Sequence, residues 1–338
     1  MQLKEEAPSG IPRGALNLAS PTLGAEAIYA NDEFFGAKER MLQDSAPVFI
    51  ADKYDDHGKW MDGWETRRRR DGGTHDYCVV RLGASGVISA VDIDTRHFTG
   101  NFPPRASIEA ATCTGGPDDA TVWTEIVAAT DLEGNSHNLR SVSADRAFNY
   151  VRINIFPDGG IARLRVYGMP VSAFDESDAQ ARHELSAAVN GGRVIGYSDA
   201  HYGDPWVILA PRRGLNMGDG WETRRRRGPG HDWIVIALGA PGIIERIAVD
   251  TAHFKGNYPD RCSVQAAMCA PAPDADIVAA SDAWGEILSP RKLSMDRLHL
   301  FEGGAVECPA PVSHVRLNIY PDGGVSRFRV FGRLAGRK

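Results

Sequence analysis

The amino-acid sequence predicts an all-β protein built from two tandem jelly-roll β-sandwich domains that are related by internal duplication. Three observations support this fold class. Four sequence blocks occur twice in the same order, at offsets between 156 and 164 residues. Apolar and polar residues alternate along short segments. Gly, Pro and Asp separate those segments, as is typical of antiparallel strands and their turns.

The duplication is clearest at Asp62–Arg70, whose residues Asp-Gly-Trp-Glu-Thr-Arg-Arg-Arg-Arg recur unchanged as Asp219–Arg227. Three further blocks recur in the same order, and they begin at Asp94 and Asp250, Trp123 and Trp284, and Asn154 and Asn318. This period is too long for a solenoid, so each copy is expected to enclose its own core. We therefore place the first domain at residues 15–170 and the second at residues 194–333, joined by a linker at residues 171–193.

The linker has the composition of a helix. Asp175–Asn190 is rich in helix-forming residues, carries acids in its first turn and ends at two glycines. The sequence therefore predicts a short helix between the two domains.

Within the first copy, the apolar pattern predicts strands at residues 87–94, 151–155 and 162–166. The last two are separated by Pro-Asp-Gly-Gly at residues 157–160, a composition typical of a hairpin turn in which glycine supplies positive φ. The second copy repeats the three strands at residues 243–250, 315–319 and 326–330.

Composition argues against several classes of protein. With 43% hydrophobic and 24% charged residues, and no apolar run near the roughly 18 residues of a membrane span, the chain is expected to be globular without a membrane partner. The net charge of −6 argues against a nucleic-acid partner. The charged opening lacks the apolar core of a secretory signal. The five cysteines form no C-x-x-C pair, so free thiols and a cytoplasmic location are expected.

The four consecutive arginines in each copy are the strongest chemical signal. On a strand, the first and third would face one way and the second and fourth the other. Each guanidinium either pairs with a neighbouring acid or holds a carboxylate or phosphate through two parallel hydrogen bonds. Arg67 and Arg69 in the first copy, and Arg224 and Arg226 in the second, are therefore candidate anion-binding residues.

Two kinds of acid–base candidate occur at matched positions. Glu65 and Glu222 stand between Trp and Thr, where a carboxyl group beside an indole ring would have a raised pKa unless it pairs with a nearby arginine. His75 and His231 each precede an aspartate, and they are either structural or suited to proton transfer. The histidine spacing fits no zinc motif, so the sequence demands no metal or other cofactor.

A polar segment follows the predicted strand at residues 87–94. It contains His97 and Asn101, which match His253 and Asn257 in the second copy. These side chains either cap turns or join a polar cluster at the rim of the sandwich.

Together these motifs resemble the allantoicase family. The resemblance rests on the paired Gly-Trp-Glu-Thr-Arg-Arg-Arg-Arg blocks, the Asp-Thr-x-His-Phe-x-Gly-Asn segments, the Pro-Asp-Gly-Gly turns and the stretch Ser198–Gly203. It extends from about residue 15 to residue 333. It implies tandem jelly rolls of the galactose-binding-like kind, and hydrolysis of allantoate to (S)-ureidoglycolate and urea in the degradation of purines through allantoin. It is compatible with a divalent metal such as manganese and suggests a homo-oligomer.

For that substrate, the arginines would hold the carboxylate. The general acid and base would come from the matched Glu and His residues Glu65, Glu222, His75 and His231. The ureido groups would receive hydrogen bonds from His97, His253, Asn101 and Asn257. The copies differ in places, for example where Arg96 becomes Ala252, so catalysis in one copy, in both, or between them stays open.

The alternative is a non-catalytic tandem module that binds carbohydrate or small anions, because jelly rolls support both roles. Sugar-binding modules usually present exposed aromatic rings at one rim. Here each copy combines Trp with Glu, His and several Arg, which suits a small anion better than a neutral sugar.

Overall fold

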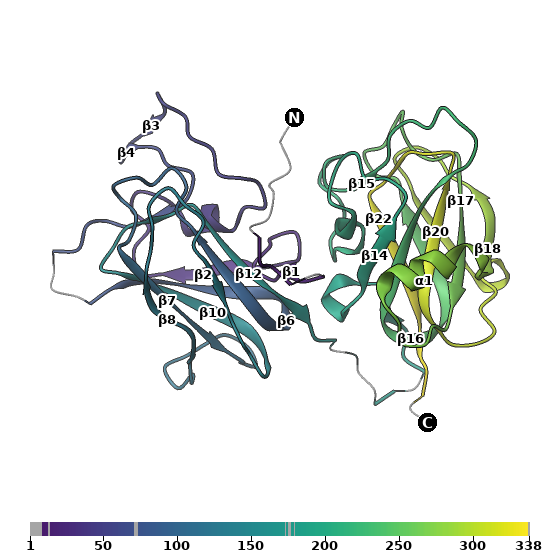
Figure 1. The fold of residues 1–338 in the computed structure, drawn as a ribbon, viewed down its shortest axis with the longest axis horizontal. Coiled ribbons are helices and arrows are strands. Elements are labelled where there is room, and N and C mark those ends of the chain that lie inside the picture. The colour runs from purple at the N-terminus through teal and green to yellow at the C-terminus, as the bar shows by residue number, and fades with distance from the viewer. Residues whose placement is uncertain are drawn as a thin grey trace. The chain divides into compact units, whose positions relative to one another are not determined.

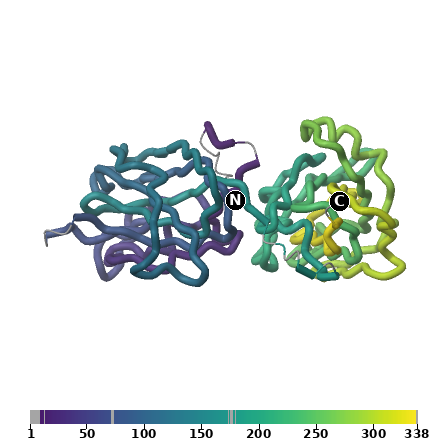
Figure 2. Tube along the Cα trace, turned by 90° about the horizontal axis from the view of Figure 1, so that it is seen from below, coloured from purple at the N-terminus to yellow at the C-terminus, as the bar shows by residue number. Residues whose placement is uncertain are grey.

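The protein is described from a computed structural model, in which the described residues are 9–12, 14–70, 74–172, 174, 177–178 and 180–336. Contacts between residues divide the chain into two compact units, residues 1–171 and 172–338. Figure 2 traces the first unit in purple to teal and the second in green to yellow. Each unit is almost entirely β-structure, which confirms the predicted fold class.

The elements of both units are labelled in Figure 1 where space allows. The first unit contains β1 (Leu16–Asn17), β2 (Glu26–Ala30), the 3-10 helix η1 (Lys38–Leu42), β3 (Tyr54–Asp55), β4 (Gly58–Lys59), β5 (Trp64–Glu65), β6 (Asp76–Asp94), β7 (Arg105–Ala111), β8 (Thr124–Asp131), β9 (Leu139–Ser141), β10 (Ala147–Phe156), β11 (Gly160–Ile161) and β12 (Arg163–Pro170).

The second unit follows the same plan with a few additions. It contains β13 (His183–Glu184), η2 (Ala188–Asn190), β14 (Arg193–Tyr197), η3 (Pro205–Leu209), β15 (Trp221–Glu222), β16 (Asp232–Asp250), β17 (Arg261–Ala267), α1 (Asp274–Ala280), η4 (Ser281–Ala283), β18 (Gly285–Lys292), β19 (Leu298–Glu302), η5 (Gly303–Ala305), β20 (Val312–Tyr320), β21 (Gly324–Val325) and β22 (Arg327–Leu334).

The duplication predicted from the sequence is visible in the strand order. The main path of the first unit is β1-β12-β6-β10-β7-β8, and that of the second is β13-β22-β16-β20-β17-β18. Each strand of the first path has its counterpart at the same place in the second path. Each unit also has a two-stranded ladder, β5 with β11 and β15 with β21, that carries the Trp-Glu pair of the repeated block.

Strand β6 belongs to both layers of the first sandwich. Its N-terminal half pairs with β10 and β2, and its C-terminal half pairs with β12 and β9. The chain bends between the halves at Gly83 and Gly86. A Cβ at Gly83 would lie 2.7 Å from the Leu23 carbonyl carbon, and one at Gly86 would lie 2.8 Å from the Met169 carbonyl oxygen. The bend therefore requires glycine at both positions.

The core follows the predicted alternation. Val151, Ile153 and Ile155 are fully buried along β10. The predicted hairpin turn follows this strand and leads directly into β11, with a cis bond before Pro157. Gly160 lies at its end, where a Cβ would come within 2.0 Å of the Phe98 ring. The turn thus packs tightly on the core beneath the arginine run.

The predicted linker helix is wrong for the described part of Asp175–Asn190. Residues 180–190 contain the short strand β13 and the single 3-10 turn η2. Strand β13 pairs with β22, and Leu185 and Ala188 are buried, so this segment is part of the second sandwich. Pairing and burial outweigh the helix propensity of so short a segment, since a few turns of isolated helix are barely stable in water.

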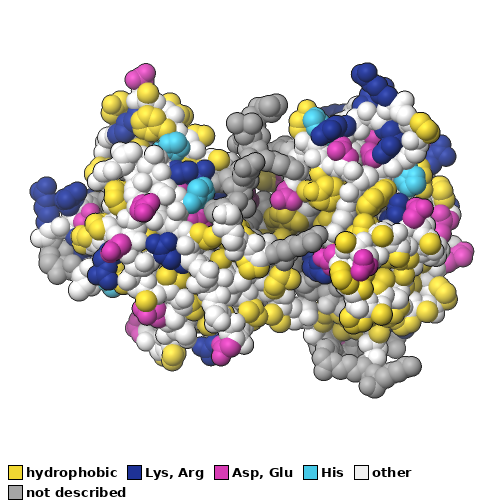
Figure 3. Space-filling model, in the orientation of Figure 1, with side chains coloured by type: hydrophobic (Ala, Val, Ile, Leu, Met, Phe, Trp, Pro, Cys, Tyr) yellow, Lys and Arg dark blue, Asp and Glu magenta, His cyan; other side chains and the backbone are white. Residues whose placement is uncertain are grey.

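Two further features bear on the predictions from composition. In the described residues there is no helix whose length and hydrophobicity would suit it to crossing a membrane. All five cysteines are free thiols, and Cys78 and Cys262 are buried. On the face drawn in Figure 3, Lys and Arg side chains stand among Asp and Glu side chains in both units.

Candidate functional site

An open cleft of about 540 Å³ lies in the first sandwich beside the arginine run. Its lining consists of Asn31, Asp32, Arg67, Arg68, Arg69, Arg70 and Asp76. Four guanidinium groups face two carboxylates here, so the lining carries a net positive charge. A cleft of this sign attracts small anions.

The arginine run is an extended loop, and the predicted strand ends before it. Strand β5 stops at Glu65 because its partner β11 is only two residues long. Beyond it, carboxylates accept the backbone hydrogen bonds. The Arg67 N–H donates to Asp32 Oδ1 at 3.2 Å, and the Arg69 N–H donates to Asp158 Oδ2 at 2.8 Å. The alternation expected of a strand therefore does not apply to these arginines.

Arg67 is held at one edge of its guanidinium and is open at the other. Its Nε donates to Asp32 Oδ2 at 2.6 Å, and its guanidinium carbon lies 5.3 Å from the centre of the Phe34 ring. The side chain is 63% exposed, and no described residue bonds its two Nη atoms. Burial alone would raise the pKa of Asp32, but hydrogen bonds from the Phe34 amide and Arg67 hold that pKa below its usual value. An ionised Asp32 thus presents the Nη pair to the cleft.

Arg69 has a different position, because it is tied to the start of β6. Its Nη1 donates to the His75 carbonyl and to Asp76 Oδ1, both at 2.6 Å. In the second repeat Arg226 makes the matching ion pair with Asp232 at 2.5 Å. These two arginines hold the loop against the sandwich and add positive charge to its surface.

Glu65 ends strand β5 and is paired with an amide. Its Oε1 accepts a hydrogen bond from Asn101 Nδ2 at 2.8 Å. Burial raises the pKa of Glu65, the Asn101 hydrogen bond opposes that rise, and the charge of Asp55 adds to it. A carboxyl group of this kind keeps its proton to higher pH than an ordinary glutamic acid, which suits proton transfer to a leaving group.

The second repeat reproduces this pair and the pinned arginine. Asn257 Nδ2 donates to Glu222 Oε1. The Arg224 N–H donates to Asp199 Oδ2 at 2.7 Å. Arg224 Nε then lies 3.1 Å from His201 Nδ1, so that an imidazole stands beside this arginine where the first repeat has a phenyl ring.

The predicted acid–base histidines lie next to the arginine loop. His75 Nδ1 is 2.9 Å from Thr74 Oγ1, and His231 Nε2 is 3.2 Å from Asn318 Oδ1. Among the described contacts, none joins either imidazole to the glutamate of its own repeat. The structure therefore brings Glu and Asn together in each repeat, and it places His beside the arginine loop.

The second pair of histidines holds a loop in place. His97 and His253 have left-handed backbones, with φ of 70° and 72°. Their Nε2 atoms lie 3.1 Å from the Pro47 carbonyl oxygen and 2.8 Å from the Gly214 carbonyl oxygen, respectively. Each ring thus fixes the segment that runs toward the Trp-Glu block.

Sequence reasoning missed the buried arginines that anchor the same segment. Fully buried Arg163 donates to the Ser45 carbonyl at 2.9 Å and pairs with Asp62 at 2.8 Å. Arg327 pairs with Asp219 at 3.0 Å in the second repeat. The matched Arg and Asp positions of the two copies were the available signal.

The carboxylates that orient the arginines were also missed. Asp32 and Asp199 each follow the strand that precedes the loop, and each occurs within a recurring six-residue stretch ending in glycine. Aligning residues 31–36 with 198–203 would have identified both.

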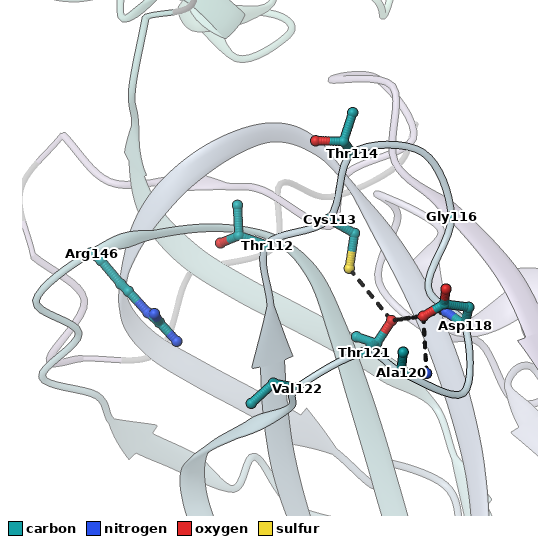
Figure 4. A pocket seen from close by; sticks show the side chains of 9 residues that line it. All are labelled: Thr112, Cys113, Thr114, Gly116, Asp118, Ala120, Thr121, Val122 and Arg146. Atoms are coloured by element: carbon teal, nitrogen blue, oxygen red, sulfur yellow. Dashed lines mark hydrogen bonds between the residues drawn. The ribbon is translucent and has the colours of Figure 1, made fainter.

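A second cavity, of about 410 Å³, lies at the opposite end of β7 from the arginine cleft. Figure 4 shows hydrogen bonds that join Cys113, Thr121 and Asp118 in its wall. Thr121 Oγ1 donates to Asp118 Oδ1 at 2.9 Å, and the Cys113 sulfur lies 3.9 Å from Thr121 Oγ1. One arginine, Arg146, lines this cavity, compared with four in the first cleft.

The described residues contain no cluster of three His, Cys, Asp or Glu side chains arranged to hold a metal ion. The part of the chain that the structure describes therefore offers no ligand set for the divalent ion with which the family resemblance is compatible.

The fold and cleft define a class: a duplicated β-sandwich protein in which an arginine-lined cleft and a half-buried glutamate lie at the repeated block. Residues 16–171 and 183–335 both match the family model described as Allantoicase repeat. The chain is 55% identical over 323 residues to a probable allantoicase 1 of Burkholderia mallei, covering 95% of each chain. It is 54% identical over 319 residues to a probable allantoicase of Ralstonia nicotianae, covering 94% of each.

The crystal structure of allantoicase from Saccharomyces cerevisiae has a TM-score of 0.77 to this chain at 34% identity. The match covers 94% of this chain and 93% of that one. The chain belongs to the allantoicase family of hydrolases. The resemblance inferred from the repeated motifs is thereby confirmed.

Proposed function

We propose that the protein hydrolyses allantoate to (S)-ureidoglycolate and urea, a step in the degradation of purines through allantoin. The observation that carries the proposal is the Nη pair of Arg67, which no described residue bonds, in a positively charged cleft of the right size for a small carboxylate. Family membership supports it, since relatives with more than half of their residues identical are named allantoicases.

The reaction sets three chemical demands. Allantoate is a carboxylate whose α-carbon carries two ureido groups. Water oxygen forms a bond to that carbon, the bond from carbon to one ureido nitrogen breaks, and the nitrogen takes a proton as urea leaves. The site must therefore hold the carboxylate, protonate the leaving nitrogen and accept a proton from water.

The arginines meet the first demand. Arg67 in the first repeat, and Arg224 in the second, are the proposed clamps on the substrate carboxylate, each worth about 1.5–3 kcal/mol as a charge-assisted hydrogen bond. Arg69 and Arg226 are already paired with acids, and we assign them the supporting role of adding positive charge.

Glu65 and Glu222 are the proposed general acids, contributing about 10²- to 10⁴-fold in rate. The raised pKa of Glu65 supports this assignment in the first repeat. Asn101 and Asn257 orient these carboxyl groups through the hydrogen bonds described above.

The matched histidines take the remaining roles. His75 and His231 are the proposed bases, beside the arginine loops. His97 and His253 are proposed to face the ureido groups with the ring atoms that the loop carbonyls leave open.

The alternative is a non-catalytic module for carbohydrate or small anions, which would use the same cleft but would not need a glutamate with a raised pKa. One experiment separates the two. Purified protein is incubated with allantoate, urea is measured over time, and the handedness of the ureidoglycolate is determined. We expect catalytic release of urea and the (S) product. Stoichiometric binding of allantoate, or binding of a sugar, without urea release would contradict the proposal.

We further propose that the protein assembles into a homo-oligomer, is located in the cytoplasm and has no nucleic-acid or membrane partner. Measurement of the molecular mass in solution by light scattering tests the first of these proposals, and a monomeric mass would contradict it.

A further inference from the structure

The two repeats share the base of one loop and differ in its length. In the first repeat the Val48 N–H donates to Asp62 Oδ2, and in the second the Leu215 N–H donates to Asp219 Oδ2, both at 2.9 Å. Thirteen residues separate these anchors in the first repeat, and three separate them in the second. At this loop the first repeat therefore carries an insertion of ten residues.

The insertion contains the β3–β4 hairpin, which projects from the first sandwich in Figure 1. Its base is fixed in the same way as that of the shorter loop, by a buried arginine and a left-handed histidine. Because the base is the same, the hairpin is an addition to a shared frame and does not remodel the sandwich.

The hairpin reaches the arginine cleft on one side and the polar loop on the other. The His57 ring lies 4.3 Å from the Phe34 ring, on which the Arg67 guanidinium is also packed. The Phe49 ring stacks on His97 with their centres 6.0 Å apart. An imidazole of the hairpin and the proposed carboxylate clamp thus contact one and the same aromatic ring.

The hairpin also brings charge close to Glu65. The negative charge of Asp55 adds to the rise in the pKa of Glu65 that burial causes. Lys59 Nζ donates to the Ile50 carbonyl at 2.7 Å and lies 4.9 Å from the Tyr54 ring, which braces the two strands. The hairpin therefore influences the carboxyl group as well as the arginine.

The second repeat has no group of this kind on the short loop. Its three residues between the anchors are Asn216, Met217 and Gly218, and none of them titrates. The Met217 sulfur lies 3.9 Å from Asn257 Nδ2, beside Glu222. This side of the site carries a thioether, and the imidazole next to the arginine of the second repeat, His201, is already bonded to Arg224 Nε.

We propose that the β3–β4 hairpin completes the hydrolytic site of the first repeat, with His57 contacting a ureido group of the substrate, and that the second repeat binds small carboxylates with much slower turnover. A neutral imidazole has one donor and one acceptor, which complements the N–H and C=O of a ureido edge. This inference rests on the proposed function, and it assigns that function to one of two otherwise similar sites.

The main test is a loop exchange in the full-length protein. Residues 49–60 are replaced by Asn-Met, the first two loop residues of the second repeat, and Met61 is kept because it packs in the core with Phe98 and Ala162. Because both anchors remain, we expect the thermal midpoint to stay close to that of the parent and kcat for urea release to fall about 100-fold. Asn216→Ala, on the matched loop of the second repeat, is the control, and it should retain the parent kcat. A folded exchange variant with the parent kcat would overturn the inference.

If the exchange variant does not fold, point variants test whether the first repeat carries the hydrolytic site. His57→Ala should raise KM or lower kcat by about tenfold for one lost hydrogen bond, and His57→Asn should recover much of that loss. Glu65→Gln should lower kcat more than Glu222→Gln does. The opposite order, or equal losses, would contradict the assignment to the first repeat. Absence of urea release from the parent protein would instead refute the proposed function itself.

Discussion

The two repeats agree in their frame and differ in what is mounted on it. Each has a buried arginine that pairs with an aspartate, a Glu–Asn pair and an arginine pinned by an aspartate. The first carries the β3–β4 hairpin, where the Phe34 ring connects an imidazole to the exposed arginine. In the second, the His201 imidazole is bonded directly to Arg224. The shared frame thus preserves the backbone of the site, while the insertion changes which groups surround it.

The largest expected effect concerns the shared frame. Arg163→Met should lower the free energy of unfolding of the first sandwich by about 3–5 kcal/mol, because Asp62 would be left buried without its partner. Arg327→Met should do the same to the second sandwich. Guanidinium denaturation measures both, with Arg105→Met as an exposed control. A loss in the free energy of unfolding below about 1 kcal/mol in either repeat would show that the two buried arginines do not play the same structural role.

The next effect distinguishes the two arginine clamps. Arg67→Ala should lower kcat/KM for allantoate roughly 10- to 150-fold, which corresponds to a loss of about 1.5–3 kcal/mol. Arg67→Lys should recover only part of this, because an ammonium lacks the two-pronged geometry. Arg224→Ala should have a smaller effect, and Arg81→Ala on the exposed side of β6 serves as control. Equal losses at both clamps would argue for equal use of both repeats.

A smaller effect is expected from the amides that hold the glutamates. Asn101→Ala should lower kcat by roughly 2- to 12-fold with little change in KM, since one hydrogen bond contributes about 0.5–1.5 kcal/mol. Its loss should also raise the pKa of Glu65, because that hydrogen bond lowers it. The descending limb of the pH–rate profile should then move to higher pH. Asn257→Ala is the matched variant, and a larger effect there would reverse the comparison.

The smallest effect is electrostatic and is limited to the first repeat. Asp55→Asn removes a negative charge that raises the pKa of Glu65, so the descending limb should move to lower pH. The raised pKa of folded Glu65 also affects stability. It adds to the free energy of unfolding at low pH, and this contribution is lost as pH rises through that pKa. Profiles of kcat against pH, with Asp56→Asn as control, measure the shift. A descending limb that does not move would show that the charge on the hairpin has no effect on the pKa of Glu65.

Much of the fold could be predicted because its signals are local. The alternation at Val151–Ile155 and the Pro-Asp-Gly-Gly turn that follows depend only on adjacent residues. Burial of Arg163 could not be predicted in this way. Alternation places it on the face opposite Leu164, but it does not reveal that a loop covers that face. The prediction of a linker helix was wrong for the same reason, because the pairing of β13 with β22 depends on residues far along the chain.

The sequence predicted several residues of the candidate site, but it did not predict which of them contact one another. The repeats single out Glu65 and Asn101, but these residues are 36 positions apart, and no pattern joins them. The four arginines look alike in sequence. Only the structure distinguishes Arg67, whose Nη atoms are unbonded by described residues, from Arg69, which is tied to Asp76. The hairpin had no partner in the second copy, so a search for recurring motifs passed over it.

The path of β6 through both layers has a consequence for how the first sandwich opens. Val80 and Val91 lie in its two halves, each between two neighbouring strands. Because one continuous strand ties both sheets together, neither sheet can detach while the other stays intact. Amide hydrogens at these positions should exchange with deuterated solvent only through complete unfolding of the unit, whereas those of the exposed hairpin should exchange through brief local fraying.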